Sequence, residues 1–394
     1  MKTQLTTNRF AHLICSRCGE KYSGYSVNTI SSCCNKPLLA NYHIDEFTSK
    51  ELITANDHSM WRYGSLLPIA DEENIVSLRE GGTPIISLDK LAEKNNISTV
   101  LMKDESFNPT GSFKARGISA AVSKAKELGI DKLIVPTAGN AGGALAAYCA
   151  KANMHCIVVM PEHTPGIFQT ECRILGAELI LVNGLIDNCA KKVEELKRHN
   201  NYFDVSTLKE PCRLEGKKTM GYEIAEQLNW QLPGIIVYPA GGGTGLIGIW
   251  KAFHEMLKMG WIKEPLPKMI AVQSQNCAPL ARALHQPSNW KENFLPRPTV
   301  ASGLAVPFPF GMDLMLDVID SSGGEVVTVG EQEIIEGIKE VATTEGLLLS
   351  PEGAAAWKAI KRLAKGKKIS EQETVLFLNT GSGYKYLESI KDFL

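Results

Sequence analysis

The sequence lacks the features that would direct a protein to a membrane or to a nucleic acid. No apolar run approaches the length of a membrane span, and the residues Met1-Lys2-Thr3-Gln4-Leu5 contain no apolar core like that of a secretory signal. Neither sign of charge is in excess, because 42 Lys and Arg residues face 43 Asp and Glu residues, for a net charge of −1. We therefore expect a cytoplasmic protein with no membrane or nucleic-acid partner.

Cysteine is plentiful, with ten residues, although nothing else in the sequence points to a disulfide framework. A chain of 394 residues with 44% hydrophobic content is long enough for two or three domains with full cores, so we expect mostly reduced thiols. Residues 1–50 stand apart by composition. They contain Cys15-Ser16-Arg17-Cys18-Gly19, which has the form of a zinc-ribbon knuckle.

The second half of a metal site in this segment would have to come from Cys33 and Cys34. Ribbon sites usually have a second pair separated by two residues, whereas adjacent cysteines are expected to point to different sides of the backbone. Two interpretations therefore stay open. One is a zinc site formed by Cys15, Cys18 and one of Cys33 or Cys34, and the other is a ribbon-shaped segment that has lost its metal.

Short apolar segments typical of buried strands alternate with helical segments from residue 99 onward. The strand-like segments are 99–103, 132–136, 156–160, 178–182, 234–238, 269–273 and 374–378. The helical segments between them include 141–152, 166–175, 186–199 and 246–259. This alternation predicts an α/β fold of βαβ units with mainly parallel sheets, covered on both faces. Ligands in such folds bind at the carboxyl ends of strands, in the loops that open the next helix.

One lysine stands where chemistry could use it. Residues 108–117 read Asn-Pro-Thr-Gly-Ser-Phe-Lys-Ala-Arg-Gly, a Pro and Gly turn in which Ser112 can cap a helix over residues 115–126. Lys114 at this helix entry, beside an aromatic residue and small residues, is a candidate for an imine-forming amine. The alternative is a surface lysine at the start of an amphipathic helix.

Two strand-to-helix loops are built from small residues. Pro136-Thr137-Ala138-Gly139-Asn140-Ala141 follows one apolar strand, and its backbone N–H groups could face a carboxylate, with the Asn140 amide beside them. Gly241-Gly242-Gly243-Thr244-Gly245 follows another strand and can form a phosphate cradle at a helix N-terminus. A plain tight turn is the alternative for the first loop. A lone phosphate cradle together with a reactive lysine matches the needs of pyridoxal 5′-phosphate.

The stretch at residues 108–114 resembles the lysine motif of the threonine synthase family, within the fold-type II (tryptophan synthase β-like) pyridoxal-phosphate enzymes. Residues 137–142 are similar to the asparagine loop of that family, and residues 241–245 are similar to its phosphate loop. The resemblance extends to Thr-Gly-Ser-Gly-Tyr-Lys at 380–385 and to the cysteine-bearing N-terminal segment, so that it spans nearly the whole chain.

The resemblance implies a role for each matching residue. Lys114 would bind the cofactor as a Schiff base, and Asn140 would hydrogen-bond the phenolic oxygen of the cofactor. The hydroxyl of Thr380, or alternatively of Ser382, would meet the pyridine nitrogen. The backbone of five loop residues would hold the cofactor phosphate: Gly241, Gly242, Gly243, Thr244 and Gly245. The substrate carboxylate would bind at Thr137, Ala138, Gly139, Asn140 and Ala141.

The resemblance also bears on the substrate. Arg213 and Lys217 lie in a segment that resembles the one that meets the substrate phosphate in threonine synthases, although a solvated charged turn before a helix at 220–228 is an equal alternative. Ala115 departs from the family, which commonly has an aspartate after the lysine. Glu105 and Glu352 are further acids, for which surface or helix-capping roles are expected.

The leading interpretation is a threonine synthase that converts O-phospho-L-homoserine and water to L-threonine and phosphate, by γ-elimination and β-addition. The alternatives are a β-eliminating or β-replacing enzyme, such as a threonine/serine ammonia-lyase or a cysteate-synthase-like enzyme, and a non-catalytic metabolite-binding relative.

The resemblance further implies a homodimer of chains with two three-layer αβα domains. We expect a ribbon-like segment at 1–50, a large cofactor-binding domain at 51–119 and 216–394, and a small αβ domain at 120–215, with the cofactor in the cleft between the two αβ domains.

Overall fold

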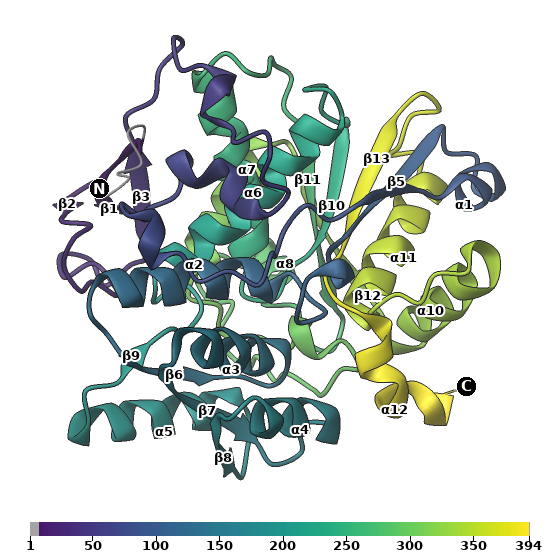
Figure 1. The fold of residues 1–394 in the computed structure, drawn as a ribbon. Coiled ribbons are helices and arrows are strands. Elements are labelled where there is room, and N and C mark those ends of the chain that lie inside the picture. The colour runs from purple at the N-terminus through teal and green to yellow at the C-terminus, as the bar shows by residue number, and fades with distance from the viewer. Residues whose placement is uncertain (1–7, 394) are drawn as a thin grey trace. The chain divides into compact units, whose positions relative to one another are not determined.

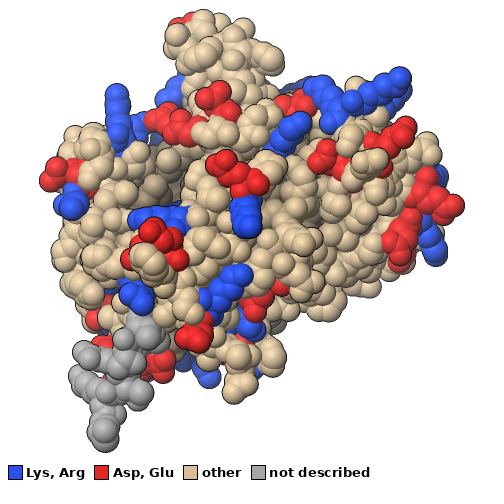
Figure 2. Space-filling model, turned by 90° about the horizontal axis from the view of Figure 1, so that it is seen from above, with Lys and Arg blue, Asp and Glu red and all other residues tan. Residues whose placement is uncertain are grey.

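The computed structural model describes residues 8–393 and has an α/β fold, as predicted. The chain divides into two compact units. Unit 1 comprises Met1–Gly82, Asn108–Gly221 and His254–Trp261, and unit 2 comprises Thr83–Phe107, Tyr222–Phe253 and Ile262–Leu394. Among the described residues, no helix is long and apolar enough to cross a lipid bilayer. Lys and Arg side chains intermingle with Asp and Glu on the face shown in Figure 2, in keeping with the balanced composition.

Unit 2 is built on a six-stranded sheet whose order is not the order of the chain (Figure 1). The strands, from one edge to the other, are β12 (Glu325–Val329), β11 (Lys268–Ser274), β10 (Ile235–Pro239), β13 (Thr374–Asn379), β5 (Thr99–Asp104) and β4 (Ile85–Ser87). All neighbours are parallel except β4, which pairs antiparallel with β5. The central pair β10 and β13 is in register at Val237 and Phe377.

Helices cover both faces of this sheet because alternate strand residues point in opposite directions. Val237 and Phe377 belong to a buried cluster with the helices α1 (Asp89–Lys94), α10 (Glu331–Glu345) and α11 (Pro351–Lys365), in which Trp357 is fully buried. The adjacent residue Tyr238 points the other way, toward Gly245 of α7 (Thr244–Lys258). The remaining helices of unit 2 are α8 (Pro279–His285), α9 (Met312–Ser321) and α12 (Leu387–Ile390).

Unit 1 contains a smaller parallel sheet with the order β8 (Glu178–Val182), β7 (His155–Pro161), β6 (Lys132–Pro136) and β9 (Phe203–Asp204). On one face, Ile157 and Val159 pack against α5 (Ile186–His199). On the other face, Val158 and Met160 lie against Gly142 of α3 (Asn140–Ala152), close to α4 (Gly166–Ile174). Each sheet therefore forms the middle of three layers.

Two further helices matter for the site. Helix α2 (Lys114–Glu127) packs against α3 within unit 1, and α6 (Cys212–Gln227) runs through Gly221 in unit 1 and continues into unit 2. The N-terminal segment forms a three-stranded antiparallel sheet with β1 (Phe10–Cys15) between β2 (Lys21–Tyr22) and β3 (Leu38–Tyr42). The strands predicted from sequence are found with each end shifted by at most one residue.

Candidate active site

Lys114 is the first residue of α2 and is partly exposed. The turn before it closes through the N–H of Gly111, which donates to the carbonyl of Asn108 at 2.7 Å, and Gly111 has φ of 64°. The prediction that Ser112 caps the helix is wrong, because Phe113 is the N-cap residue and no side chain caps it. Within residues 8–393, the Ser112 hydroxyl is buried and has no hydrogen-bond partner.

Arg213 and Lys217 lie inside α6, so the alternative of a solvated turn is wrong. Arg213 is 1% exposed and Lys217 is fully buried. The Lys217 Nζ lies 5.3 Å from the centroid of the Phe113 ring, and the Lys114 Nζ lies 4.4 Å from the same centroid. The structure thus places the predicted phosphate ligand Lys217 and the predicted catalytic lysine against the same aromatic ring.

Gly117 is the reason that Lys217 can reach this position. A Cβ atom at Gly117 would lie 2.1 Å from the Lys217 Nζ and 2.5 Å from the Arg213 carbonyl oxygen. A Cβ atom at Gly216 would similarly lie 2.2 Å from the Arg116 carbonyl oxygen. Helices α2 and α6 therefore approach each other closely through two glycines, which holds the start of one against the cationic turn of the other.

The Arg213 guanidinium combines burial with unused hydrogen-bonding capacity. The guanidinium Nη1 donates to the Val205 carbonyl. The backbone N–H of Arg213 donates to the Glu210 carboxylate at 2.7 Å. Its Nε is buried and has no partner within the part of the chain that the structure describes. Burial lowers the pKa of Arg213 to about 10, so the group remains a cation at neutral pH. A buried cation with a spare donor is suited to an anionic ligand.

The asparagine loop is ordered by its own first residue. The N–H of Gly139 donates to the Thr137 hydroxyl at 3.2 Å, and α3 begins at Asn140. Thr137 is 7% exposed, while Ala138 and Asn140 are partly exposed. The first N–H groups of a helix have no partner inside the helix, so this loop can accept a carboxylate. Because α2 packs against α3, unit 1 contains both the predicted lysine and the predicted asparagine loop.

The glycine loop of unit 2 needs glycine for close packing. Gly243 has φ of 82°, and a Cβ atom there would lie 2.3 Å from the Met315 Sδ. A Cβ atom at Gly245 would lie 2.0 Å from the hydroxyl oxygen of Tyr238. The loop is thus pressed against its own unit, and Thr244 opens α7 with a side chain that is 4% exposed. A side-chain-free loop at a helix N-terminus fits a phosphate group.

Thr380 lies beside this loop for a topological reason. It directly follows β13, which is the parallel neighbour of β10, and β10 leads into the glycine loop. The carboxyl ends of parallel neighbours meet at one edge of a sheet, so unit 2 brings Thr380 and the glycine loop together. Thr380 is 6% exposed, and Ser382 forms an isolated bridge with Leu349.

The expectation that Glu352 lies on the surface is wrong, although it does stand in the first turn of α11, where an acidic residue is favoured. Glu352 is 4% exposed and accepts the N–H of Gly303 at 2.7 Å and the hydroxyl of Tyr386 at 3.3 Å. Gly303 in turn packs on Gly241, because a Cβ at Gly241 would lie 2.1 Å from the Gly303 carbonyl oxygen. Glu352 therefore supports the glycine loop through one intervening segment. Burial raises the pKa of Glu352.

Glu105 is also buried rather than on the surface. It is fully buried, and its carboxylate accepts the hydroxyl of Thr83 at 2.6 Å. Its charge adds to the effect of burial and raises the pKa of Tyr238. Neither Glu105 nor Glu352 belongs to a local sequence motif, so only the fold could show their partners.

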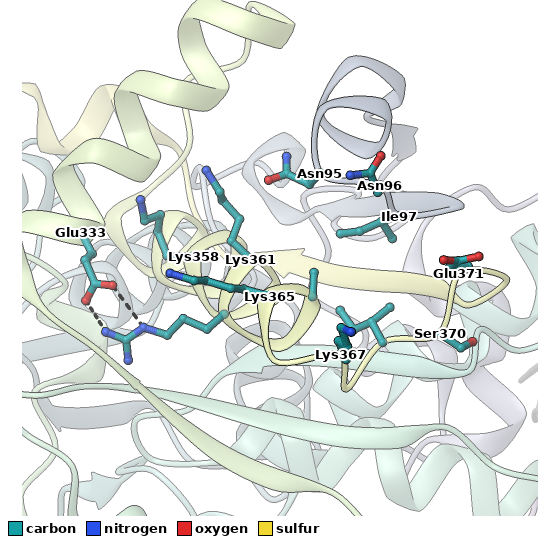
Figure 3. A pocket seen from close by; sticks show the side chains of 13 residues that line it. Asn95, Asn96, Ile97, Glu333, Lys358, Lys361, Lys365, Lys367, Ser370 and Glu371 are labelled. Carbon is teal, nitrogen blue, oxygen red and sulfur yellow. Dashed lines mark hydrogen bonds and ion pairs between the residues drawn. The ribbon is translucent and has the colours of Figure 1, made fainter.

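A separate surface pocket of about 870 Å³ lies in unit 2 and includes no predicted site residue (Figure 3). Its walls are rich in lysine, and three of its cations, Lys358, Lys361 and Arg362, are paired with carboxylates. Lys361 contacts Glu340 at 2.7 Å, and Arg362 pairs with Glu333. These three are ordinary surface ion pairs.

The lysine at a helix entry and the phosphate cradle indicate an enzyme that uses pyridoxal phosphate, and comparison with known proteins gives the same class. The family described as "Pyridoxal-phosphate dependent enzyme" matches residues 76–381, and the chain belongs to this family. Its cofactor is pyridoxal phosphate, which Lys114, the glycine loop and Thr380 suit by their chemistry.

Among curated proteins, the chain is similar to threonine synthases. It is 34% identical over 376 residues to that of Methanocaldococcus jannaschii, covering 94% of this chain and 92% of the relative. It is 33% identical to that of Methanosarcina acetivorans over 386 residues, covering 97% of this chain and 94% of the relative.

Solved structures share the fold at low sequence identity. Maize serine racemase has a TM-score of 0.65 at 17% identity, covering 79% of this chain and 92% of that one. The processed form of threonine deaminase isoform 2 from Solanum lycopersicum has a TM-score of 0.64 at 23% identity, covering 79% and 87%. These neighbours confirm the predicted fold-type II architecture.

Proposed function

We propose that this enzyme is a threonine synthase, which converts O-phospho-L-homoserine and water to L-threonine and phosphate. The observation that carries the proposal is the pair of ammonium groups over Phe113, with Nζ-to-centroid distances of 4.4 Å for Lys114 and 5.3 Å for Lys217. An amino-acid substrate held at Lys114 would extend a terminal phosphate toward a buried cation. The similarity to two threonine synthases at 33–34% identity supports the same substrate.

The bound cofactor supplies the electron sink for carbanions next to the substrate amino group. Lys114 would hold the cofactor, and its amine would remove protons from the α and β carbons and return protons to the γ and α carbons. The bond from the γ carbon to the phosphate oxygen breaks, and the hydroxyl of water adds at the β carbon. Lys217 and Arg213 stabilise the leaving phosphate as its charge grows, and the loop at residues 137–141 holds the substrate carboxylate.

The remaining cofactor contacts are proposals of the same kind. The backbone of residues 241–245 would hold the cofactor phosphate, Asn140 would hydrogen-bond the phenolic oxygen, and Thr380 would meet the ring nitrogen. A hydroxyl at that nitrogen does not force its protonation, unlike a carboxylate.

A second candidate rests on Ala115. This residue is fully buried directly after Lys114, where threonine synthases commonly carry an aspartate. A site without that carboxylate is compatible with an enzyme that only eliminates or replaces at the β carbon, such as a threonine/serine ammonia-lyase.

The test uses purified protein loaded with pyridoxal phosphate. Borohydride reduction followed by peptide mapping should locate the cofactor on Lys114, which tests the cofactor site without any turnover. The protein is then given O-phospho-L-homoserine, O-phospho-L-serine, L-serine and L-threonine separately, while phosphate, threonine and keto acids are measured. Threonine and phosphate in equal amounts from the first substrate support the proposal. Keto acid from serine or threonine would assign the second candidate instead, and full turnover by Lys114→Ala would overturn both.

A further inference from the structure

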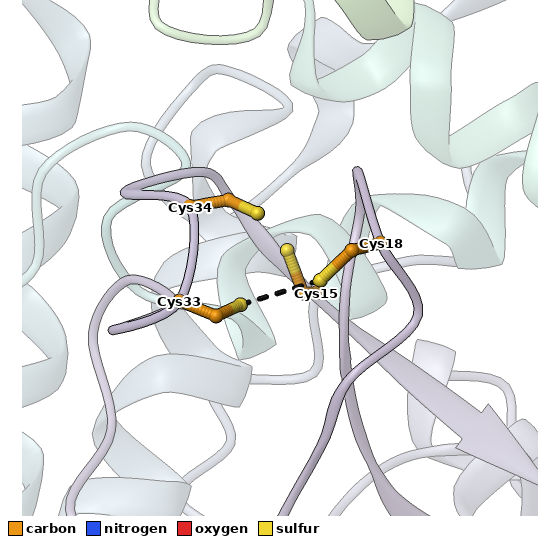
Figure 4. Close-up of side chains that lie close together, drawn as sticks. All are labelled: Cys15, Cys18, Cys33 and Cys34. Carbon is orange, nitrogen blue, oxygen red and sulfur yellow. Dashed lines mark hydrogen bonds between the residues drawn. The ribbon is translucent and has the colours of Figure 1, made fainter.

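The N-terminal segment brings four thiols together in a way that adjacent cysteines were not expected to allow (Figure 4). The sulfur atoms of Cys15, Cys18, Cys33 and Cys34 all lie within 4.8 Å of one another, and those of Cys18 and Cys33 are 3.4 Å apart. Cys33 and Cys34 lie in a turn rather than in a strand, so the alternation of side chains along a strand does not apply to them. None of the four is in a disulfide.

The two turns that carry these thiols have the same backbone hydrogen bonds. In the first, the N–H of Gly19 donates to the carbonyl of Cys15 at 3.0 Å, and the N–H of Cys15 donates to the carbonyl of Glu20 at 2.8 Å. In the second, the N–H of Asn35 donates to the carbonyl of Ser31 at 2.9 Å, and the N–H of Ser31 donates to the carbonyl of Lys36 at 2.9 Å.

The left-handed residue is also equivalent, with φ of 75° at Gly19 and 51° at Asn35. The second turn is therefore a knuckle of the same form, displaced by sixteen residues along the chain.

This correspondence shows which ligand is unusual. Cys34 is the equivalent of Cys18, whereas the equivalent of Cys15 is Ser31, whose hydroxyl accepts the Cys15 thiol at 3.3 Å. The sequence shows a broken motif because serine occupies the third of the four ligand positions, where the equivalent of Cys15 would stand. The structure places the thiol of Cys33 within the cluster, from inside the same turn.

We propose that Cys15, Cys18, Cys33 and Cys34 bind one zinc ion, with Cys33 providing the thiolate that Ser31 cannot. Tetrahedral coordination at a Zn–S distance of about 2.3 Å places sulfurs about 3.8 Å apart. The observed separations, 3.4 Å for one pair and at most 4.8 Å for any pair, need only small adjustments to reach this value. A disulfide would instead need a sulfur pair at about 2.05 Å and would leave two thiols over.

The metal has a structural role that reaches α6. Among residues 8–50, the antiparallel sheet of the segment has three strands, and β2 contains two residues, so the sheet has little core of its own. The last residue of β3, Tyr42, donates its hydroxyl to the buried Glu215 of α6 at 2.8 Å. Zinc would fix the ribbon and thereby hold Tyr42 against the helix that carries Lys217.

The first experiment measures metal in the full-length protein, prepared under reducing conditions and without substrate, so that its outcome does not depend on the proposed function. Mass spectrometry of the elements should find one zinc per chain. A mercurial reagent should release that zinc after four thiol equivalents, as followed with a chromogenic chelator. Absence of zinc after incubation with zinc salt, a stoichiometric iron content, or a native disulfide between Cys18 and Cys33 would each overturn the proposal.

Variants then test the ligand set. Cys18→Ser and Cys33→Ser each remove a proposed ligand, so each should remove at least nine-tenths of the zinc. Both residues are exposed, so neither change should disturb a packed core. Cys277→Ala, a buried cysteine of unit 2, is the matched control and should keep one zinc per chain.

The decisive variant is Ser31→Cys in the Cys33→Ser background, because it restores the regular knuckle and should restore full zinc content. Retention of zinc by Cys33→Ser alone would show that Cys33 is not a ligand. Failure of the double variant to regain zinc, while its folding is normal by circular dichroism, would refute the equivalence of the two knuckles.

Discussion

Two neighbouring lysines on α6 are both fully buried, yet the structure gives them different tasks. The Lys218 Nζ contacts the carboxylates of Glu215 at 2.8 Å and Glu255 at 2.9 Å, and it lies 3.8 Å from the Tyr42 ring centroid. The Lys217 Nζ lies over the Phe113 ring beside Lys114. We therefore predict that substitution of Lys217 impairs substrate binding, whereas substitution of Lys218 impairs stability.

The magnitudes separate the two roles. Lys218→Met leaves two buried carboxylates without their cation, which costs about 3–5 kcal/mol of unfolding free energy. Lys217→Met keeps the volume nearly constant and removes the hydrogen bond of 3.4 Å from the Nζ to the Arg213 carbonyl, so the loss of stability should stay below that of Lys218→Met. It removes a charge-assisted contact with the substrate phosphate worth about 1.5–3 kcal/mol, which lowers kcat/KM for O-phospho-L-homoserine by roughly 10- to 150-fold.

Urea unfolding and steady-state kinetics measure the two effects in parallel. Inorganic phosphate serves as a probe that requires no turnover, because it should compete with substrate in the wild type and compete at least tenfold more weakly in Lys217→Met. The reasoning is refuted if Lys217→Met unfolds as easily as Lys218→Met while its KM and phosphate inhibition match those of the wild type.

Three further changes test other parts of the structure. Gly243→Ala introduces a Cβ atom 2.3 Å from Met315 at a φ of 82°. It should weaken cofactor binding at least tenfold, as measured by equilibrium titration. Gly260→Ala is the control, because Gly260 has a φ of 67° but open space around its Cβ position, and it should leave cofactor binding unchanged. Tyr42→Phe removes a hydrogen bond to a buried carboxylate and should lower the free energy of unfolding, measured in urea, by about 1–3 kcal/mol. A decrease of less than about 0.5 kcal/mol would contradict this prediction. Burial raises the pKa of Glu352, so its carboxyl favours folding when protonated and this contribution is lost as pH rises through the folded pKa. Relative to Glu352→Gln, the wild type should therefore lose stability as pH rises above about 4.3, and parallel stability curves from pH 4 to pH 8 would contradict this.

Local pattern was sufficient for the lysine motif and for the seven strands predicted from residue 99 onward, but not for the start of α6. The apolar runs 132–136 and 178–182 became β6 and β8 with the predicted bounds, because both are short apolar segments bounded by polar or turn residues. Two other edge strands, β9 and β12, escaped prediction. β9 contains two residues, and the residues of β12 other than Val329 are only partly buried, so neither has a strong apolar signal.

The sequence by itself determined the α/β class, the identity of the candidate lysine and the loops that could bind anions, because each depends on residues close together in the chain. Only the tertiary structure decided what surrounds them. Helix crossing at Gly117 put Lys217 beside Lys114, the strand order put Thr380 beside the glycine loop, and a second knuckle put Cys33 where Ser31 breaks the motif. These contacts join segments far apart in the chain, and their formation depends on packing that no local pattern encodes.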